Sequence, residues 1–221
     1  MRYDEGVARA VSRSLVAIVL TAAVAAGYEP TLNRQAIEEA IAIGQSRLDS
    51  TRARYHQPYR IHVGRPPVDY IDVVTPFRRL ELAVEEQSRA GNRLFRQQDA
   101  LAVLAVHGDR LNVVIEFTFH PLNSYVGVPP YMVTLARADA PGRIDALEIQ
   151  RIPRFGARID GTHLPYPSAP VIPSGGQPML GGTLIVSFGG GRLEPRGTYD
   201  IVIEESGKEL ARERVDLGNL R

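Results

Sequence analysis

Apolar residues occupy every second position from Leu111 to Phe119, and this alternation constrains the fold more than any other feature of the chain. Most of the residues between them are polar, and His120 continues the polar series. A period of two is typical of a β-strand that buries one face against a core. The chain therefore contains at least one strand of a sheet with a covered face.

Several other runs have β-type composition and are separated by turns that contain Gly or Pro. They cover residues 59–63, 68–74, 131–138, 143–152, 183–188, 198–205 and 209–215. Ser206-Gly207-Lys208 predicts a tight turn, and hence an antiparallel hairpin, between the last two runs. Short strands at this spacing predict an antiparallel β-sandwich-like core, with an open barrel as the alternative.

Helical periodicity appears in two regions that precede the main strands. Residues 33–55 form one amphipathic pattern that begins at the N-cap Asn33, and Gly44 on its apolar face predicts the close approach of another element. Thr75-Pro76 begins a second helix, and a shorter helix is expected over 97–105. We therefore predict an α+β fold in which an N-terminal helix and the inserted segment 76–105 pack against the sheets.

The N-terminus has the pattern of a secretory signal peptide. Arg2, Arg9 and Arg13 precede an uncharged run over residues 15–26, which includes an A-x-A site at 23–25. Twelve apolar residues are too few for a bilayer span, which needs about 20. We expect cleavage to leave a single domain over 27–221 in the periplasm or outside the cell, without a permanent membrane span; a retained anchor is the alternative.

Composition excludes several classes of function. The chain of 221 residues has no cysteine, so it has no disulfide framework, zinc–thiolate site or cysteine nucleophile. Removing the three arginines and two acidic residues before residue 27 leaves 23 basic and 23 acidic residues. The basic residues are also scattered, so we expect no nucleic-acid partner.

The densest group of polar and aromatic side chains lies between His120 and Tyr131, directly after the clearest strand. Loops that a rigid sheet presents in this way often carry binding residues. The alternative is a Pro-rich strand connection whose Asn and Ser satisfy the local backbone. The ligand-binding residues that we expect are His120, Asn123, Tyr125 and Tyr131, with Tyr166 from the Pro-rich segment 160–182.

The titratable residues show no recognisable catalytic or metal motif. The five histidines, at positions 56, 62, 107, 120 and 163, lack the paired spacing of H-E-x-x-H. Glu85-Glu86 is expected on the solvated side of the second helix, not as a catalytic carboxylate pair. We therefore expect no metal site and no cofactor.

Two stretches resemble a family of uncharacterised bacterial exported proteins, in which a TPF-type helix start precedes an F-x-H-P strand end. The first runs from Val74-Thr75-Pro76-Phe77-Arg78-Arg79 through Gly91 to Asp99-Ala100-Leu101. The second joins Phe117-Thr118-Phe119-His120-Pro121 to Tyr125-Val126-Gly127-Val128-Pro129, and Val215-Asp216-Leu217-Gly218 adds to it. The resemblance covers roughly residues 70–135. It implies an exported single domain and no particular activity.

Three functions remain open. The first, which we favour, is a non-catalytic exported module that binds a protein or small ligand through the loop 120–131 and the segment 160–182. The second is a periplasmic hydrolase or lyase with His120 or His163 as its base. The third is an envelope assembly component that pairs with another chain through the edge strand 209–215.

Overall fold

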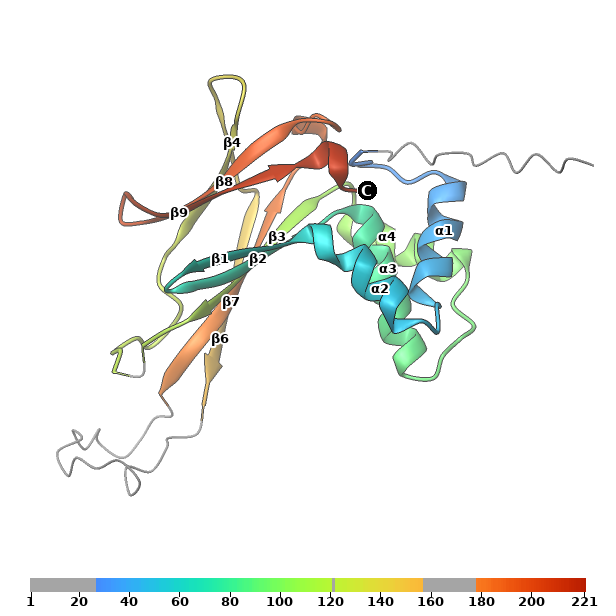
Figure 1. Cartoon of the computed structure of the whole chain (residues 1–221), viewed down its shortest axis with the longest axis horizontal. Helices are drawn as coiled ribbons and strands as arrows, with labels where there is room; N and C mark the ends of the chain where they lie inside the picture. The colour runs from blue at the N-terminus through green and yellow to red at the C-terminus, as the bar shows by residue number, and fades with distance from the viewer. Residues whose placement is uncertain (1–26, 121, 157–177) are drawn as a thin grey trace, which may run out of the picture.

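The computed structural model describes residues 27–120, 122–156 and 178–221. In these ranges nine strands form two antiparallel sheets, and four helices gather at one end of the sheets (Figure 1). The chain therefore has an α+β fold with a sandwich-like core, as the sequence predicts. The expected signal segment 1–26 and most of the Pro-rich segment 160–182 lie outside the described residues.

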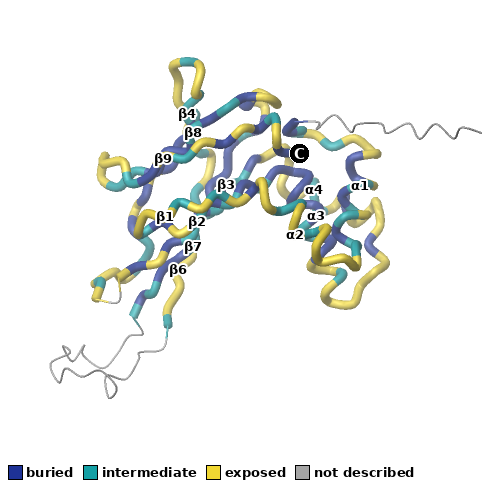
Figure 2. Tube along the Cα trace, in the orientation of Figure 1, coloured by how far each residue is buried: buried dark blue, intermediate teal, exposed yellow. Residues whose placement is uncertain are grey.

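The larger sheet has the strand order β1-β2-β3-β7-β6. β3 lies at its centre, and its apolar side chains Leu111, Val113, Ile115 and Phe117 are all completely buried, which confirms the predicted alternation. Figure 2 shows buried segments along the central strands, whereas β6 at the sheet edge is largely exposed. The five strands are β1 (Arg60–Arg65), β2 (Val68–Val74), β3 (Leu111–Thr118), β7 (Met179–Phe188) and β6 (Glu148–Phe155).

The smaller sheet has the order β5-β4-β8-β9. Its last two strands form the predicted hairpin, in which Ser206 and Gly207 adopt φ angles of 51° and 80°. Two consecutive positive φ angles are typical of the type I′ turn that joins twisted antiparallel strands. The four strands are β5 (Arg143–Asp145), β4 (Met132–Arg137), β8 (Thr198–Glu205) and β9 (Lys208–Asp216).

The single strand predicted over 143–152 is wrong, because the chain changes sheets within it. β5 pairs with β4 in the smaller sheet, whereas β6 pairs with β7 in the larger one. At the crossing, the backbone N–H of Leu147 donates to the carbonyl oxygen of Ser187 over 2.8 Å. This bond anchors the new pairing one residue before β6 begins.

The helices are α1 (Arg34–Gly44), α2 (Asp49–His56), α3 (Pro76–Arg89) and α4 (Gln97–His107). The predicted N-caps are confirmed: Asn33 Oδ1 accepts from the N–H of Ala36 over 2.9 Å, and Thr75 Oγ1 accepts from that of Arg78 over 3.1 Å. The helices bury an apolar cluster separate from that of the sheets, and Tyr55 packs against both clusters. No helix in the described ranges combines the length and apolar character needed to span a bilayer.

The continuous helix predicted over 33–55 is also wrong. α1 ends at Gly44, and α2 begins only at Asp49. Between them the hydroxyl of Ser46 accepts the N–H of Leu48 over 3.3 Å, a local bond that competes with helix continuation. The predicted close approach at Gly44 is confirmed, since a Cβ atom there would lie 2.8 Å from the carbonyl oxygen of Glu81.

Candidate metal centre

Two carboxylates of α3 point to the same side of the helix, because Glu81 and Glu85 are four residues apart. Both residues are buried, with exposed fractions of 0% and 4%. The prediction that Glu85 lies on the solvated side is therefore wrong, whereas its neighbour Glu86 is exposed. The difference arises because side chains of α2 cover this side of α3.

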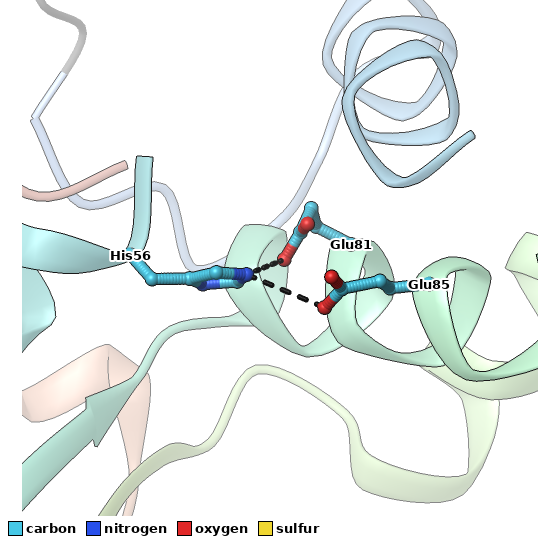
Figure 3. A group of neighbouring side chains, drawn as sticks. All are labelled: His56, Glu81 and Glu85. Carbon is cyan, nitrogen blue, oxygen red and sulfur yellow. Dashed lines mark ion pairs between the residues drawn. The ribbon is translucent and has the colours of Figure 1, made fainter. Parts of the chain in front are cut away.

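His56 is the last residue of α2 and brings its imidazole to the two carboxylates (Figure 3). Its Nε2 atom lies 3.4 Å from Glu81 Oε2 and 3.4 Å from Glu85 Oε2. Each of the three side chains offers one donor atom, and these atoms all lie within 4.8 Å of one another. The cluster thus joins one nitrogen and two oxygen ligands from separate helices.

The second carboxylate oxygen of Glu85 is held by two arginines. Glu85 Oε1 forms an ion pair with Arg52 Nε at 2.8 Å and accepts a hydrogen bond from Arg89 Nη2 over 2.9 Å. These contacts leave Oε2 directed toward His56. Such outer contacts orient the ligand groups of metal sites.

Glu81 has no comparable support. Neither of its carboxylate oxygens, and neither ring nitrogen of His56, has a hydrogen-bond partner among the described residues. Burying an ionised carboxylate without compensation costs several kcal/mol. Because Glu81 is completely buried, its carboxylate needs a neighbouring cation, and the imidazole nitrogen Nε2 of His56 lies 3.4 Å from it.

The distances from His56 Nε2 to the two carboxylates fit a tetrahedral metal ion. Zinc lies about 2.0–2.2 Å from imidazole nitrogen and carboxylate oxygen, so two ligands at a tetrahedral angle are about 3.4 Å apart. Both distances from His56 Nε2 have this value, and the three donor atoms all lie within 4.8 Å of one another. Mixed nitrogen and oxygen donors favour zinc and similar transition metals, whereas Mg²⁺ and Ca²⁺ prefer oxygen ligands alone.

A pocket of about 680 Å³ opens beside the cluster. This volume is within the range of small-molecule sites. His56 and Glu85 form part of its wall, so a cation held by them is accessible from solvent, while Glu81 lies beneath. The basic residues of the wall are Arg60, His62, Arg78 and Arg89.

Two tyrosines fix the end of α2. Tyr55 and Tyr59 share a hydrogen bond of 2.8 Å between their hydroxyl groups, and Tyr59 also bonds the backbone of Arg221. Burial raises the pKa of Tyr55, and the negative charge of nearby Glu81 adds to the rise. The phenol therefore stays neutral and keeps its place beside the imidazole of His56, with the two rings edge to face.

The loop 120–131 does not form a comparable site. His120 is exposed, and its Nδ1 accepts the N–H of Leu122 over 3.2 Å. Asn123 donates to the carbonyl oxygens of His120 and Met179, as the backbone-satisfying alternative requires. Among the described residues, no carboxylate forms an ion pair with His120.

The tyrosines proposed for binding lie in different environments. Tyr125 is 41% exposed and packs its ring edge against Phe119, whereas Tyr131 is 1% exposed and stacks on Phe117. Tyr166, like His163, lies outside the described residues. Of the predicted binding residues that the structure describes, none lines the pocket beside the cluster.

Sequence reasoning missed the cluster of His56, Glu81 and Glu85. The spacing Glu81-x-x-x-Glu85 was a detectable signal, because it places two carboxylates on one side of a helix. His56 lies far from them in the chain and carries no local signal. Only the packing of α2 onto α3 brings it within reach.

Comparisons with protein-family models, with curated proteins and with solved structures found no match to this chain. The resemblance to exported bacterial proteins therefore stays a prediction, and the geometry of the cluster carries the functional argument.

Proposed function

We propose that this protein is an exported domain that binds a divalent transition-metal cation through His56, Glu81 and Glu85. The observation that carries the proposal is the carboxylate of Glu81, which is completely buried and has no hydrogen-bond donor among the described residues. A cation at the centre of the cluster compensates this charge. It also uses the nitrogen of His56 and the free oxygen of Glu85.

Three protein ligands leave a tetrahedral ion with one open position. Closed sites with four protein ligands are structural, whereas sites with three hold water or a small molecule in the fourth position. Here the open position faces the pocket, because His56 and Glu85 both line it. The proposal thus keeps the small-ligand function expected from the sequence and moves it from the loop 120–131 to the helices.

The proposal predicts one high-affinity cation per chain. The full chain, stripped with a chelator and dialysed, is titrated calorimetrically with Zn²⁺, Mn²⁺ and Mg²⁺. We expect Zn²⁺ to bind with a stoichiometry of one, and Mg²⁺ to bind much more weakly because it prefers oxygen ligands. His56→Gln and Glu81→Gln should each weaken zinc binding by about 100-fold.

Matched controls come from residues outside the cluster. His107→Gln removes a histidine at the end of α4, and Glu116→Gln removes a partly covered carboxylate that accepts from Thr183. Both variants should bind zinc like the parent chain. The proposal fails if the parent chain takes up no zinc, or if Glu81→Gln binds it as tightly as Glu116→Gln does.

A further inference from the structure

We infer that the pocket, once its cation is bound, takes a dianionic oxyanion of the phosphate type, with Arg60 and Arg89 beside the open coordination position. This inference rests on the proposed cation site. It adds the chemical class of the ligand that completes the coordination, and it assigns a role to the N–H groups of Arg60 and Arg89 that bind no carboxylate.

The first support is the charge of the pocket. Its wall contains three arginines, at positions 60, 78 and 89. Their formal charge equals that of three nearby carboxylates, Asp72, Glu81 and Glu85, of which only Asp72 and Glu85 contact the arginines. A divalent cation therefore leaves an excess of two positive charges at the pocket, which a dianion neutralises.

A fourth arginine does not alter this balance. Arg52 contacts Glu85 from the side of α2, and its charge is offset by Asp49, with which it also pairs. Positive charge confined to a pocket concentrates the electric field and attracts anions. The excess charge of the cation-loaded pocket thus selects for an anionic ligand over a neutral one.

The second support is the set of N–H groups that remain available. Asp72 binds Arg60 through Nε and Nη2, over 3.2 and 2.7 Å, which leaves the N–H groups of Nη1 for another acceptor. Arg89 uses only Nη2 for Glu85, and its side chain is 70% exposed. Arg60 is 46% exposed, so both guanidinium groups reach solvent at the pocket.

The third support is the match between these groups and a phosphate group. Guanidinium groups donate paired hydrogen bonds to phosphate oxygens, and a bound metal ion polarises a further oxygen of the same group. A monocarboxylate has one negative charge and two oxygens, so it satisfies fewer of these groups. Inorganic phosphate and a phosphate monoester share the required chemistry.

The test uses the full chain loaded with one equivalent of Zn²⁺, with excess metal removed. Calorimetric titrations with inorganic phosphate, phenyl phosphate and acetate compare the two phosphate sources and a monocarboxylate. We expect both phosphate compounds to bind at least about tenfold more tightly than acetate, and about tenfold more weakly to the metal-free chain. Tighter binding of phenyl phosphate would identify a monoester as the ligand, and equal or weaker binding would identify free phosphate.

Arg60→Gln is the decisive variant, and Arg110→Gln is its matched control. Arg110 is 44% exposed and pairs with one carboxylate, Glu148, over 2.8 Å, so it resembles Arg60 in exposure and pairing. We expect Arg60→Gln to weaken phosphate binding about tenfold and Arg60→Lys to weaken it less. Arg110→Gln should bind phosphate like the parent.

The possible failures are distinguishable. If zinc binds but phosphate binds equally well without it, or if Arg60→Gln matches Arg110→Gln, the phosphate inference is overturned and the cation site stands. If acetate binds as tightly as phosphate, the ligand class is wrong. If the chain takes up no zinc, the proposed function fails and this inference fails with it.

Discussion

A Cβ atom at Gly44 would lie 2.8 Å from the carbonyl oxygen of Glu81, so α1 and α3 meet with almost no side chain between them. The contact occurs at the residue that carries the buried carboxylate of the cluster. α1 therefore packs directly against the backbone that carries Glu81, although it supplies no ligand itself.

Gly44→Ala should destabilise the protein and weaken zinc binding. Alanine gains about 1 kcal/mol over glycine within a helix, but overpacking costs about 1–3 kcal/mol. The added methyl group would also meet Val84 at 2.8 Å, so α3 must move. Urea unfolding and zinc titration measure the two effects. Gly127→Ala is the control, because a Cβ atom there meets nothing within 4 Å.

Glu81→Gln should have opposite effects with and without zinc. In chelator, the variant should be more stable than the parent by about 1–3 kcal/mol, because an uncompensated buried charge is removed. With zinc at 100 times its dissociation constant, the parent alone should gain about 2.7 kcal/mol. Thermal unfolding under both conditions measures the difference. Destabilisation of Glu81→Gln in chelator would instead indicate an ion pair between His56 and Glu81.

Tyr131→Ala should act on stability and not on a binding surface. The ring is 1% exposed and stacks on Phe117 at a centroid distance of 4.6 Å. Removing it should cost about 3–5 kcal/mol, as is usual for a buried aromatic side chain. Tyr125→Ala, at a residue that is 41% exposed, should cost much less. Urea unfolding of both variants tests this order, and equal losses would contradict it.

The pH dependence of stability should include a contribution from His107. Burial lowers the pKa of this imidazole below its usual range, and the charges of Arg79 and Arg110 lower it further. The unfolded chain therefore takes up a proton at a higher pH than the folded chain. The contribution of His107 to stability is complete above about pH 6.5, the usual pKa of histidine, and is lost as the pH falls toward the folded value.

The measurement for His107 is the urea midpoint between pH 7.5 and pH 5. The parent chain should lose more stability over this range than His107→Gln does, by a small amount because the residue is exposed. A steeper pH dependence in the variant would contradict the assigned direction of the shift.

Features with local causes were predictable from the sequence. The alternation in β3, the N-caps Asn33 and Thr75 and the turn at Ser206-Gly207 each depend on neighbouring residues, and the structure confirms them. The close approach at Gly44 was predictable as well, because glycine weakens a helix and is favoured on an apolar face mainly where a second backbone lies against it.

Features that depend on tertiary contacts were not predictable in the same way. The residues over 143–152 have strand character throughout, and nothing in them shows that the chain changes sheets at Leu147. Glu85 is a charged residue of the kind that is usually exposed on a helix, yet the side chains of Arg52 and His56 cover it. The candidate site was missed for this reason: its members become neighbours only when α2 folds back onto α3.

Tyr55 packs against the apolar clusters of both the helices and the sheets, and His56 follows it directly in the chain. A cation that links His56 to α3 would therefore fasten α2, the helix that meets both clusters, to the rest of the helical half. In the metal-free protein the helices should unfold before the sheets do. The metal-loaded protein should unfold in a single cooperative step. Amide hydrogen exchange in α2 should then be fast in the metal-free protein and slow in the metal-loaded protein. It would report occupancy of the cation site without any measurement of the metal itself.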